Sequence, residues 1–333
     1  DVYKRQFQVV LTVGIVILGL IGLWKLATVF PSTRARIMAL AVYAASPLIG
    51  GAMAIGSFDT LVAYAAVPWI LHKSAHAAGV TTADPRTAAD DLPDGVLDLA
   101  TPERARRILQ LGVVVALAAA FSPVMLVVAF VIGVLLAAAS ALAMAPPRTT
   151  AWFAASSVGA ALVAIVLNVP WIGTWSWSGI LDPPPVGEAG LGLLSVASFE
   201  IGPTTFAYLA LALYLPVVAA VLLARAWRLT WAVRSGILVV VFGGAAVLGD
   251  RGDLPFAAPQ TGVLLAPVAV GLAVSAAAAL AAFDLDVRGG TFGWRQPLGL
   301  AAGTAAVVGL LPGVLAIGDG DWGAPSNPIG GLT

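Results

Sequence analysis

The sequence predicts an all-α, polytopic membrane protein, a transmembrane bundle of about ten helical spans. Two observations support this prediction. Of the 333 residues, 60% are hydrophobic and only 10% are charged, whereas soluble domains contain about 25% charged residues. The apolar residues also form long continuous runs, unlike the alternating pattern of a membrane β-barrel. This composition excludes water-soluble enzymes and disordered chains. Because 17 basic and 17 acidic residues balance, no nucleic-acid partner is expected.

The spans are predicted from apolar runs, since the hydrocarbon core takes about 20 residues of helix. Ser122-Pro123 separates two of the runs as a hairpin or a kink. Two other runs are short, so we expect each to be tilted, re-entrant or extended by flanking residues. In chain order, the runs are 7–30, 37–56, 60–72 (short), 108–122 (short), 124–145, 150–170, 204–225, 235–249, 261–283 and 297–317.

Basic residues predict the side of each connection, because cytoplasmic loops carry an excess of Lys and Arg. The outer connections carry carboxylates, above all loop 171–203, which has no Lys or Arg. From residue 148 onward, each span reverses the side without conflict. A multi-pass protein of the plasma membrane, with the lipid bilayer as partner, is therefore expected. The predicted cytoplasmic connections are 31–36, the long polar loop 73–107, 146–149, 225–234 and 284–296.

Both ends of the chain are interpreted as not belonging to the fold. Residues 1–6 resemble translated sequencing-adapter sequence, with a genuine basic flank as the alternative. Residues 7–322 form the predicted membrane domain, and 323–333 read as a truncated tail. The chain is thus expected to be a fragment of a longer protein. A signal peptide at 7–30 is the weaker alternative, because no small-x-small cleavage site follows.

The residue inventory excludes several kinds of site. The chain has no cysteine, so disulfides, thiolate zinc sites and iron–sulfur clusters are excluded. His72 and His76 share one helix face, but two imidazoles do not complete a metal site. The D-x-D pairs at 284–286 and 319–321 are short enough to arise by chance, and no metal ligands are assigned. Few ionisable residues lie at mid-span, which argues against an ion-driven transporter.

Carboxylates and aromatic rings on the outer side are the candidates for chemistry. Carboxylates accept hydrogen bonds from sugar hydroxyls and act as general bases, and tryptophan rings stack on sugars. As alternatives, the tryptophans form an interfacial belt and Asp59 caps the helix that begins near residue 60. The candidates are Asp59, Glu188 and Glu200 as catalytic groups, and Trp171, Trp175, Asp182, Asp250 and Arg251 as substrate-binding groups.

Several short motifs resemble one protein family. They are Tyr43-Ala44-Ala45-Ser46-Pro47, Gly56-Ser57-Phe58-Asp59 with the following run 61–69, Ala119-Ala120-Phe121-Ser122-Pro123, Asn168-Val169-Pro170-Trp171 and Phe292-Gly293-Trp294-Arg295-Gln296. Together they resemble the membrane region of large actinobacterial proteins that join a cytosolic family 2 glycosyltransferase domain to a multi-span region. One departure concerns the acidic motif, where Ser57-Phe58 replaces an Arg-Trp pair before Asp59.

The resemblance implies a role in cell-envelope glycan synthesis. It implies a polyprenyl-phosphate sugar as donor and a fused cytosolic glycosyltransferase domain as partner. A divalent cation is a further candidate cofactor, because D-x-D pairs can chelate one. The predicted function is the membrane portion of an envelope glycosyltransferase that acts on lipid-linked or polymeric glycan at the outer face. The alternative is a non-enzymatic lipid-linked-sugar flippase, or a membrane scaffold for envelope synthesis.

Overall fold

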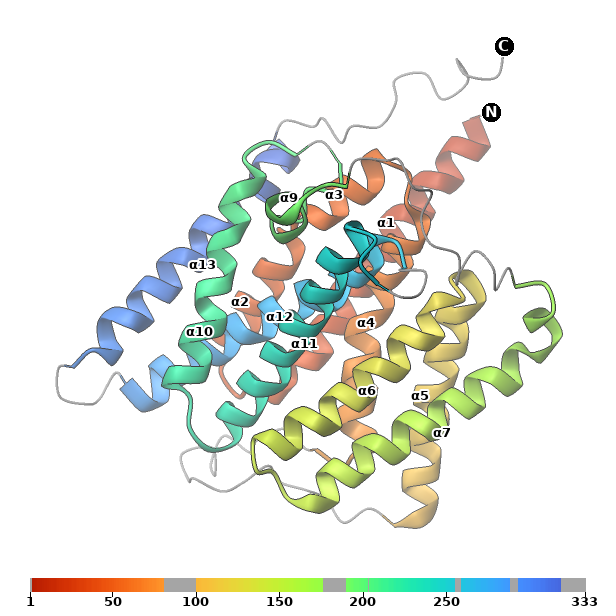
Figure 1. The fold of residues 1–333 in the computed structure, drawn as a ribbon, viewed down its shortest axis with the longest axis horizontal. Coiled ribbons are helices and arrows are strands. Elements are labelled where there is room, and N and C mark those ends of the chain that lie inside the picture. Colours follow the sequence, from red (N-terminus) through yellow and green to blue (C-terminus); the bar gives the residue numbers. More distant parts are fainter. Residues whose placement is uncertain are drawn as a thin grey trace.

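The computed structural model describes residues 2–80, 100–175, 190–202, 204–254, 259–287 and 293–318, with side chains from residue 12 onward. The regular elements in these ranges are helices packed in one bundle (Figure 1). Seven spans in them are long and apolar enough to cross a membrane, so the chain is a multi-pass helical membrane protein. These spans are α1 (Val2–Leu26), α2 with α3 (Thr33–Ala44 and Pro47–Ala54), α6 (Val124–Leu142), α7 (Pro147–Ile172), α11 (Ala226–Asp250), α12 (Thr261–Ala282) and α13 (Arg295–Gly318).

The two short apolar runs belong to full-length helices. Helix α4 (Phe58–Ala77) has 20 residues and α5 (Thr101–Phe121) has 21, so flanking residues extend both runs. The predicted loop 73–107 is therefore too long, because its first residues continue α4 and its last ones begin α5. The remaining elements are short: η1 (Ala27–Val29), α9 (Leu193–Ala197), η2 (Ala207–Leu213) with α10 (Tyr214–Leu223), and η3 (Phe283–Val287).

The predicted connection 225–234 is wrong, because α11 begins at Ala226 and these residues form its first turns. Arg234 is fully buried there. Its Nε donates to Ser140 Oγ at 3.0 Å, and its guanidinium lies 5.1 Å from the ring centroids of both Phe153 and Trp231. The two aromatic rings and the Ser140 hydroxyl thus stabilise the guanidinium charge inside the bundle. The assignment of arginines to cytoplasmic loops does not predict a buried arginine of this kind.

Proline breaks the predicted span 37–56 into α2 and α3. Ser46 precedes Pro47 and is the N-cap of α3, with its hydroxyl accepting from Leu48 N at 3.4 Å. Proline at the first helical position sacrifices no hydrogen bond of the new helix, but it cannot continue the old one. The chain therefore crosses in two pieces at this point.

Two stacked tyrosines exchange hydrogen bonds between α2 and α4, and one of these bonds serves a carbonyl that a proline leaves open. Pro68 lacks the N–H that would bond the Tyr64 carbonyl four residues earlier, whereas the Tyr43 carbonyl, four residues before Pro47, also accepts from Ser46 N at 3.2 Å. The Tyr43 hydroxyl donates to Tyr64 O at 2.5 Å, and the Tyr64 hydroxyl donates to Tyr43 O at 3.2 Å. The two rings stack with centroids 4.1 Å apart. This exchange joins α2 to α4 within the buried bundle.

Replacing Tyr43 with Phe is expected to destabilise the fold by about 1–3 kcal/mol, because the Tyr64 carbonyl then lacks a donor in a dry interior. Adding Pro68→Ala to this variant restores an N–H four residues after Tyr64, so the double variant is expected to recover part of the loss. Unfolding of the detergent-solubilised chain in increasing SDS measures both effects. Additive destabilisation in the double variant would contradict this explanation.

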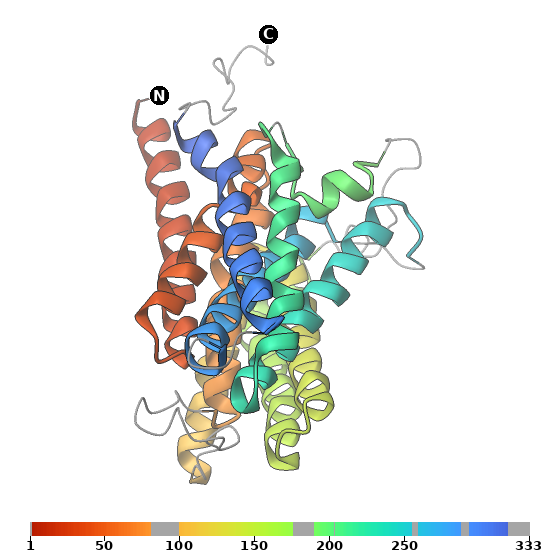
Figure 2. The ribbon, with the colours of Figure 1, turned by 90° about the vertical axis from the view of Figure 1, so that its left-hand side faces the viewer.

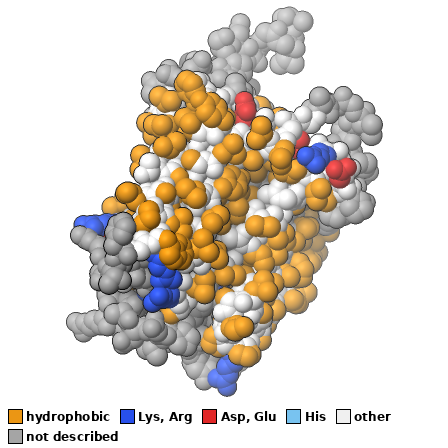
Figure 3. Space-filling model, turned by 60° about the vertical axis from the view of Figure 1, so that its left-hand side comes forward, with side chains coloured by type: hydrophobic (Ala, Val, Ile, Leu, Met, Phe, Trp, Pro, Cys, Tyr) orange, Lys and Arg blue, Asp and Glu red, His pale blue; other side chains and the backbone are white. Residues whose placement is uncertain are grey.

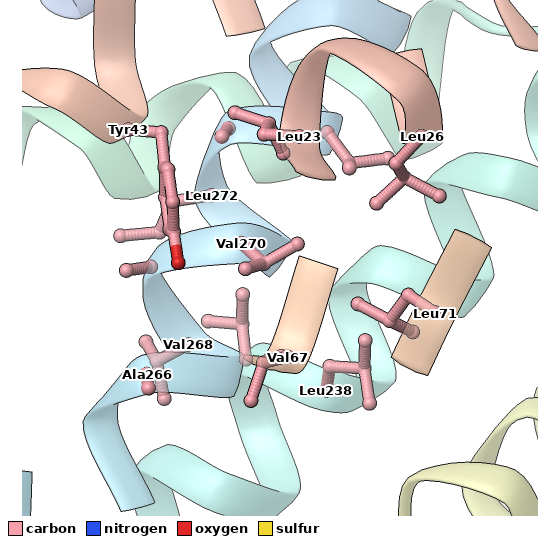
Figure 4. Close-up of a cluster of buried hydrophobic side chains, with 14 of the residues drawn as sticks. Leu23, Leu26, Tyr43, Val67, Leu71, Leu238, Ala266, Val268, Val270 and Leu272 are labelled. Atoms are coloured by element: carbon pink, nitrogen blue, oxygen red, sulfur yellow. The ribbon is translucent and has the colours of Figure 1, made fainter. Parts of the chain in front are cut away.

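Helix α12 lies at the centre of the bundle. Every residue from Gly262 to Ala279 is buried, as expected for a helix that is apolar on all sides. Its small residues let neighbouring helices approach closely; a Cβ built at Gly271 would lie only 2.9 Å from Ser235 O of α11. Figure 4 shows residues of this core contributed by α1, α2, α4, α11 and α12: Leu23, Leu26, Tyr43, Val67, Leu71, Leu238, Ala266, Val268, Val270 and Leu272.

The charged residues separate to the two ends of the bundle. One end, here the basic end, contains the end of α1 and α4 and the start of α2, α5, α7, α11 and α13, where most described Lys and Arg residues lie. The other end, here the acidic end, contains α3, α9, the start of α4 and the end of α11, with Asp59, Glu200, Asp250 and Asp253 (Figure 2). Figure 3 shows one largely apolar face, with the acidic side chains towards its upper end beside a basic one, and further basic side chains towards its lower end. The grouping of connections agrees with the one predicted from charge.

Candidate functional site

Asp59 lies in a tight turn at the acidic end. Gly56 adopts φ +70°, which lets the chain reverse between α3 and α4. Ser57 Oγ is hydrogen-bonded to Thr60 Oγ1 at 2.7 Å and donates to Gln260 Oε1 at 2.9 Å. These bonds fasten the turn to the residue before α12.

The carboxylate of Asp59 is left available by this arrangement. Ser57, not Asp59, occupies the N-cap position of α4, so the capping alternative for Asp59 is wrong. Asp59 follows in the first turn, half-buried, and no described residue forms a hydrogen bond or ion pair with it. The positive end of the α4 dipole stabilises its negative charge. A half-buried carboxylate of this kind can accept a proton or a hydroxyl hydrogen bond.

Glu200 is held on a segment that packs against the same turn. Phe199 has φ +63°, and Glu200 N donates to Ser195 O at 2.8 Å, which folds the chain back after α9. Ile201 and Thr60 both flank Gly262: a Cβ built there would clash with the Thr60 hydroxyl and lie 3.1 Å from Ile201 Cδ1. The immediate neighbours of Asp59 and Glu200 therefore meet over the first turn of α12.

Asp250 has a structural partner. As the last residue of α11, it accepts hydrogen bonds from Leu191 N and Gly192 N, both at 3.0 Å, one on each carboxylate oxygen. It thereby anchors the chain that leads into α9 and Glu200. Arg251 follows as the exposed C-cap of α11. Substrate binding by Asp250 and Arg251 stays a prediction. Both carboxylate oxygens of Asp250 already accept backbone hydrogen bonds from the segment before α9.

The tryptophans stand apart from this turn. Trp171 lies near the end of α7, which packs against α5 and α6 (Figure 1). Its side chain is 59% exposed, as expected for a residue of an interfacial belt. Trp175 is half-buried in the turn after α7. The structure thus places Asp59, Glu200 and Asp250 at the acidic end, with Trp171 on α7 and Trp175 in the turn that follows it.

Other predicted residues lie outside the described ranges. These are Asp182, Glu188 and the pair at 319–321, so the structure does not place them relative to Asp59. Among the side chains described, no group of three or more His, Asp or Glu residues is arranged to hold a metal ion. Sequence reasoning missed Gln260 and Thr60; the one available signal was a polar amide directly before a long apolar run.

Comparison of the chain with models of known protein families, with curated proteins and with solved structures finds no match. The family resemblance of the short motifs therefore stays a prediction, and the functional argument depends on the geometry of the acidic end.

Proposed function

We propose that the chain is the membrane portion of a cell-envelope glycosyltransferase. Its acidic end faces the outside of the plasma membrane and receives a lipid-linked or polymeric glycan. Asp59 is the general base that takes the proton from the acceptor hydroxyl, and Glu200 binds sugar hydroxyls beside it. A polyprenyl-phosphate sugar is the donor class that fits a site at the membrane surface, and a fused cytosolic glycosyltransferase domain is the expected partner.

One observation carries this proposal. Asp59 is a half-buried carboxylate without a described partner, in a turn tied down by two hydrogen bonds. The surrounding structure restrains its backbone while leaving its oxygens available, and a general base needs both properties. Glu200 on the adjoining segment and the Ser57–Gln260 pair supply further hydrogen-bonding groups of the kind that sugars use.

The orientation also belongs to this proposal, together with a count of about ten spans. Helices α4 and α5 and the pair η2–α10 then cross the membrane beside the seven more apolar spans. The basic end faces the cytoplasm, as the excess of Lys and Arg there favours.

Single cysteines test this orientation cleanly, because the chain contains none. We expect a membrane-impermeant maleimide to label Asp253→Cys on intact cells, since Asp253 is exposed at the acidic end. Met144→Cys, with Met144 93% exposed at the basic end, is expected to react only after lysis. The reverse pattern would place Asp59 in the cytoplasm and remove the proposed outer site.

The reaction is tested with the purified chain in nanodiscs. A panel of radiolabelled polyprenyl-phosphate sugars is supplied with an envelope glycan acceptor, with and without Mg²⁺, and transfer is measured by chromatography of the acceptor. Transfer from one donor supports the proposal. In liposomes, movement of a labelled lipid-linked sugar between leaflets without transfer would overturn it in favour of the flippase alternative.

A further inference from the structure

A small cavity opens at the basic end between α1, α4 and α11. Its volume is about 20 Å³, and its lining includes Leu26, Thr28, His72, His76 and Trp231. A space of this size holds one water molecule or one oxygen atom of a larger group. The two imidazole rings lie 4.4 Å apart, centroid to centroid. The cavity therefore brings two imidazole rings and the side chain of Thr28 into a mainly apolar lining, at the end of the bundle opposite to Asp59.

Positive charge surrounds this cavity. Lys25 lies in the last turn of α1, and Lys73 lies between the two histidines in the sequence of α4. Arg107 of α5 donates to His76 O at 2.9 Å. On the inner side, the guanidinium of Arg234 lies 5.1 Å from the Trp231 ring centroid. Basic residues on four helices therefore lie near residues that line the cavity, although none of them is part of the lining itself.

The nearby carboxylate of Glu103 pairs with Arg107 and with Arg106, and not with the two lysines. It accepts from Arg107 Nε at 2.9 Å and from Arg106 Nη2 at 3.0 Å. These hydrogen bonds, that of Arg107 first, lower the pKa of Glu103, so its charge is taken up by the two arginines of its own helix. Neither Lys25 nor Lys73 forms an ion pair with a described carboxylate, and Lys73 Nζ donates to the neutral Gln110 Oε1 at 3.2 Å.

Trp231, one of the residues that line the cavity, carries a buried donor without a partner. Trp231 is 3% exposed, and its Nε1–H has no hydrogen-bond partner among the described residues. The indole N–H only donates, and burying it unpaired costs free energy. An acceptor atom in the cavity would satisfy it. With cations at the opening, an anionic oxygen is the acceptor that the surroundings favour most.

The approach to the cavity is a lipid-facing surface. Ile17, Ile21 and Trp24 of α1 are 49%, 44% and 37% exposed, and they lead along the helix to Lys25. An apolar helix face above an interfacial lysine suits an acyl chain with its headgroup at the lysine. A soluble anion has no acyl chain that could pack against this apolar face of α1.

We propose that the cavity binds the phosphate of an anionic lipid in the leaflet at the basic end. One phosphate oxygen enters the cavity and accepts from Trp231 Nε1–H. The remaining oxygens contact Lys25 and Lys73, and the acyl chains lie along α1. This lipid site is separate from the proposed transfer site, and it holds whether or not the chain is a glycosyltransferase.

Native mass spectrometry of the detergent-solubilised chain tests the site. Titration with phosphatidylglycerol is expected to give one tight adduct that an equal concentration of phosphatidylcholine does not give. The double variant Lys25→Gln/Lys73→Gln is expected to weaken the adduct about tenfold or more, given the contribution of interfacial lysines to anionic lipid binding. Trp231→Phe keeps the ring, removes the donor and is expected to weaken it about fivefold.

Matched charge controls lie at the same end. Arg148 and Arg225 are exposed there and do not line the cavity, so Arg148→Gln/Arg225→Gln is expected to change the affinity less than twofold. An equal loss in this control would overturn the proposal by showing general surface attraction. Full competition by millimolar inorganic phosphate would also overturn it, because the ligand would then be a soluble anion.

Discussion

Replacing Asp59 with Asn is expected to lower glycosyl transfer by about 10²- to 10⁴-fold, the usual contribution of a general base. The amide keeps the size of the side chain but cannot take the acceptor proton. Asp59 makes no described hydrogen bond or ion pair, so the substitution removes no contact of the fold. The stability of the variant is therefore expected to stay within about 1 kcal/mol of the parent chain, since only the interaction of the charge with the α4 dipole is lost. Loss of activity without loss of stability is the result that identifies a catalytic carboxylate.

Two matched variants accompany this experiment. Asp253→Asn removes an exposed carboxylate from the same end and is expected to leave transfer unchanged. Asp250→Asn weakens the hydrogen bonds to Leu191 N and Gly192 N and is expected to lower stability together with activity. Full transfer by Asp59→Asn would exclude this residue as the base and leave Glu200 as the described candidate, tested by Glu200→Gln in the same assay.

The helical segments could be predicted from the sequence because each membrane-spanning helix needs about 20 mostly apolar residues. Each apolar run contains a helix, and the sorting of basic and acidic connections to opposite ends also follows from the sequence. The errors arise where packing overrides composition. Arg234 was assigned to a loop because it is charged, but Ser140, Phe153 and Trp231 bury it within α11. Those partners are distant in the chain, so no local pattern reports them.

The candidate site was predictable only in part, for the same reason. Asp59 stands out in the sequence as a carboxylate in a short polar turn between apolar runs. Its relation to Gln260 and Ile201 depends on how α3, α4 and α12 meet, and no spacing rule contains this. The tryptophans were grouped with the carboxylates because they share a side of the membrane, whereas the structure places Trp171 on α7. Residues that lie on the same side of the membrane need not be close enough to form one binding site.

Among the described glycines, the one at which a built Cβ would come closest to another backbone is expected to give the largest loss of stability on substitution. At Gly313, α13 crosses the break between α2 and α3. A Cβ built there would lie 2.6 Å from Ala45 Cα and closer still to the Ala45 carbonyl oxygen. These are backbone atoms that follow a capped break at Ser46 and Pro47, so no side-chain rotation relieves the clash. We expect Gly313→Ala to destabilise the fold by about 3 kcal/mol, at the upper end for overpacking.

Gly303 provides the matched control, because it lies in the same helix and a Cβ there meets nothing within 4 Å. Alanine at a free helical position is favoured over glycine by about 1 kcal/mol, so Gly303→Ala is expected to be neutral or stabilising. Both variants are compared by SDS-induced unfolding in the same detergent. If Gly313→Ala is as stable as Gly303→Ala, α13 does not pack on the α2–α3 break as described. If Gly313→Ala is unstable and Gly303→Ala is not, the small residue is required by the close approach of the two backbones, as in other tightly packed membrane helices.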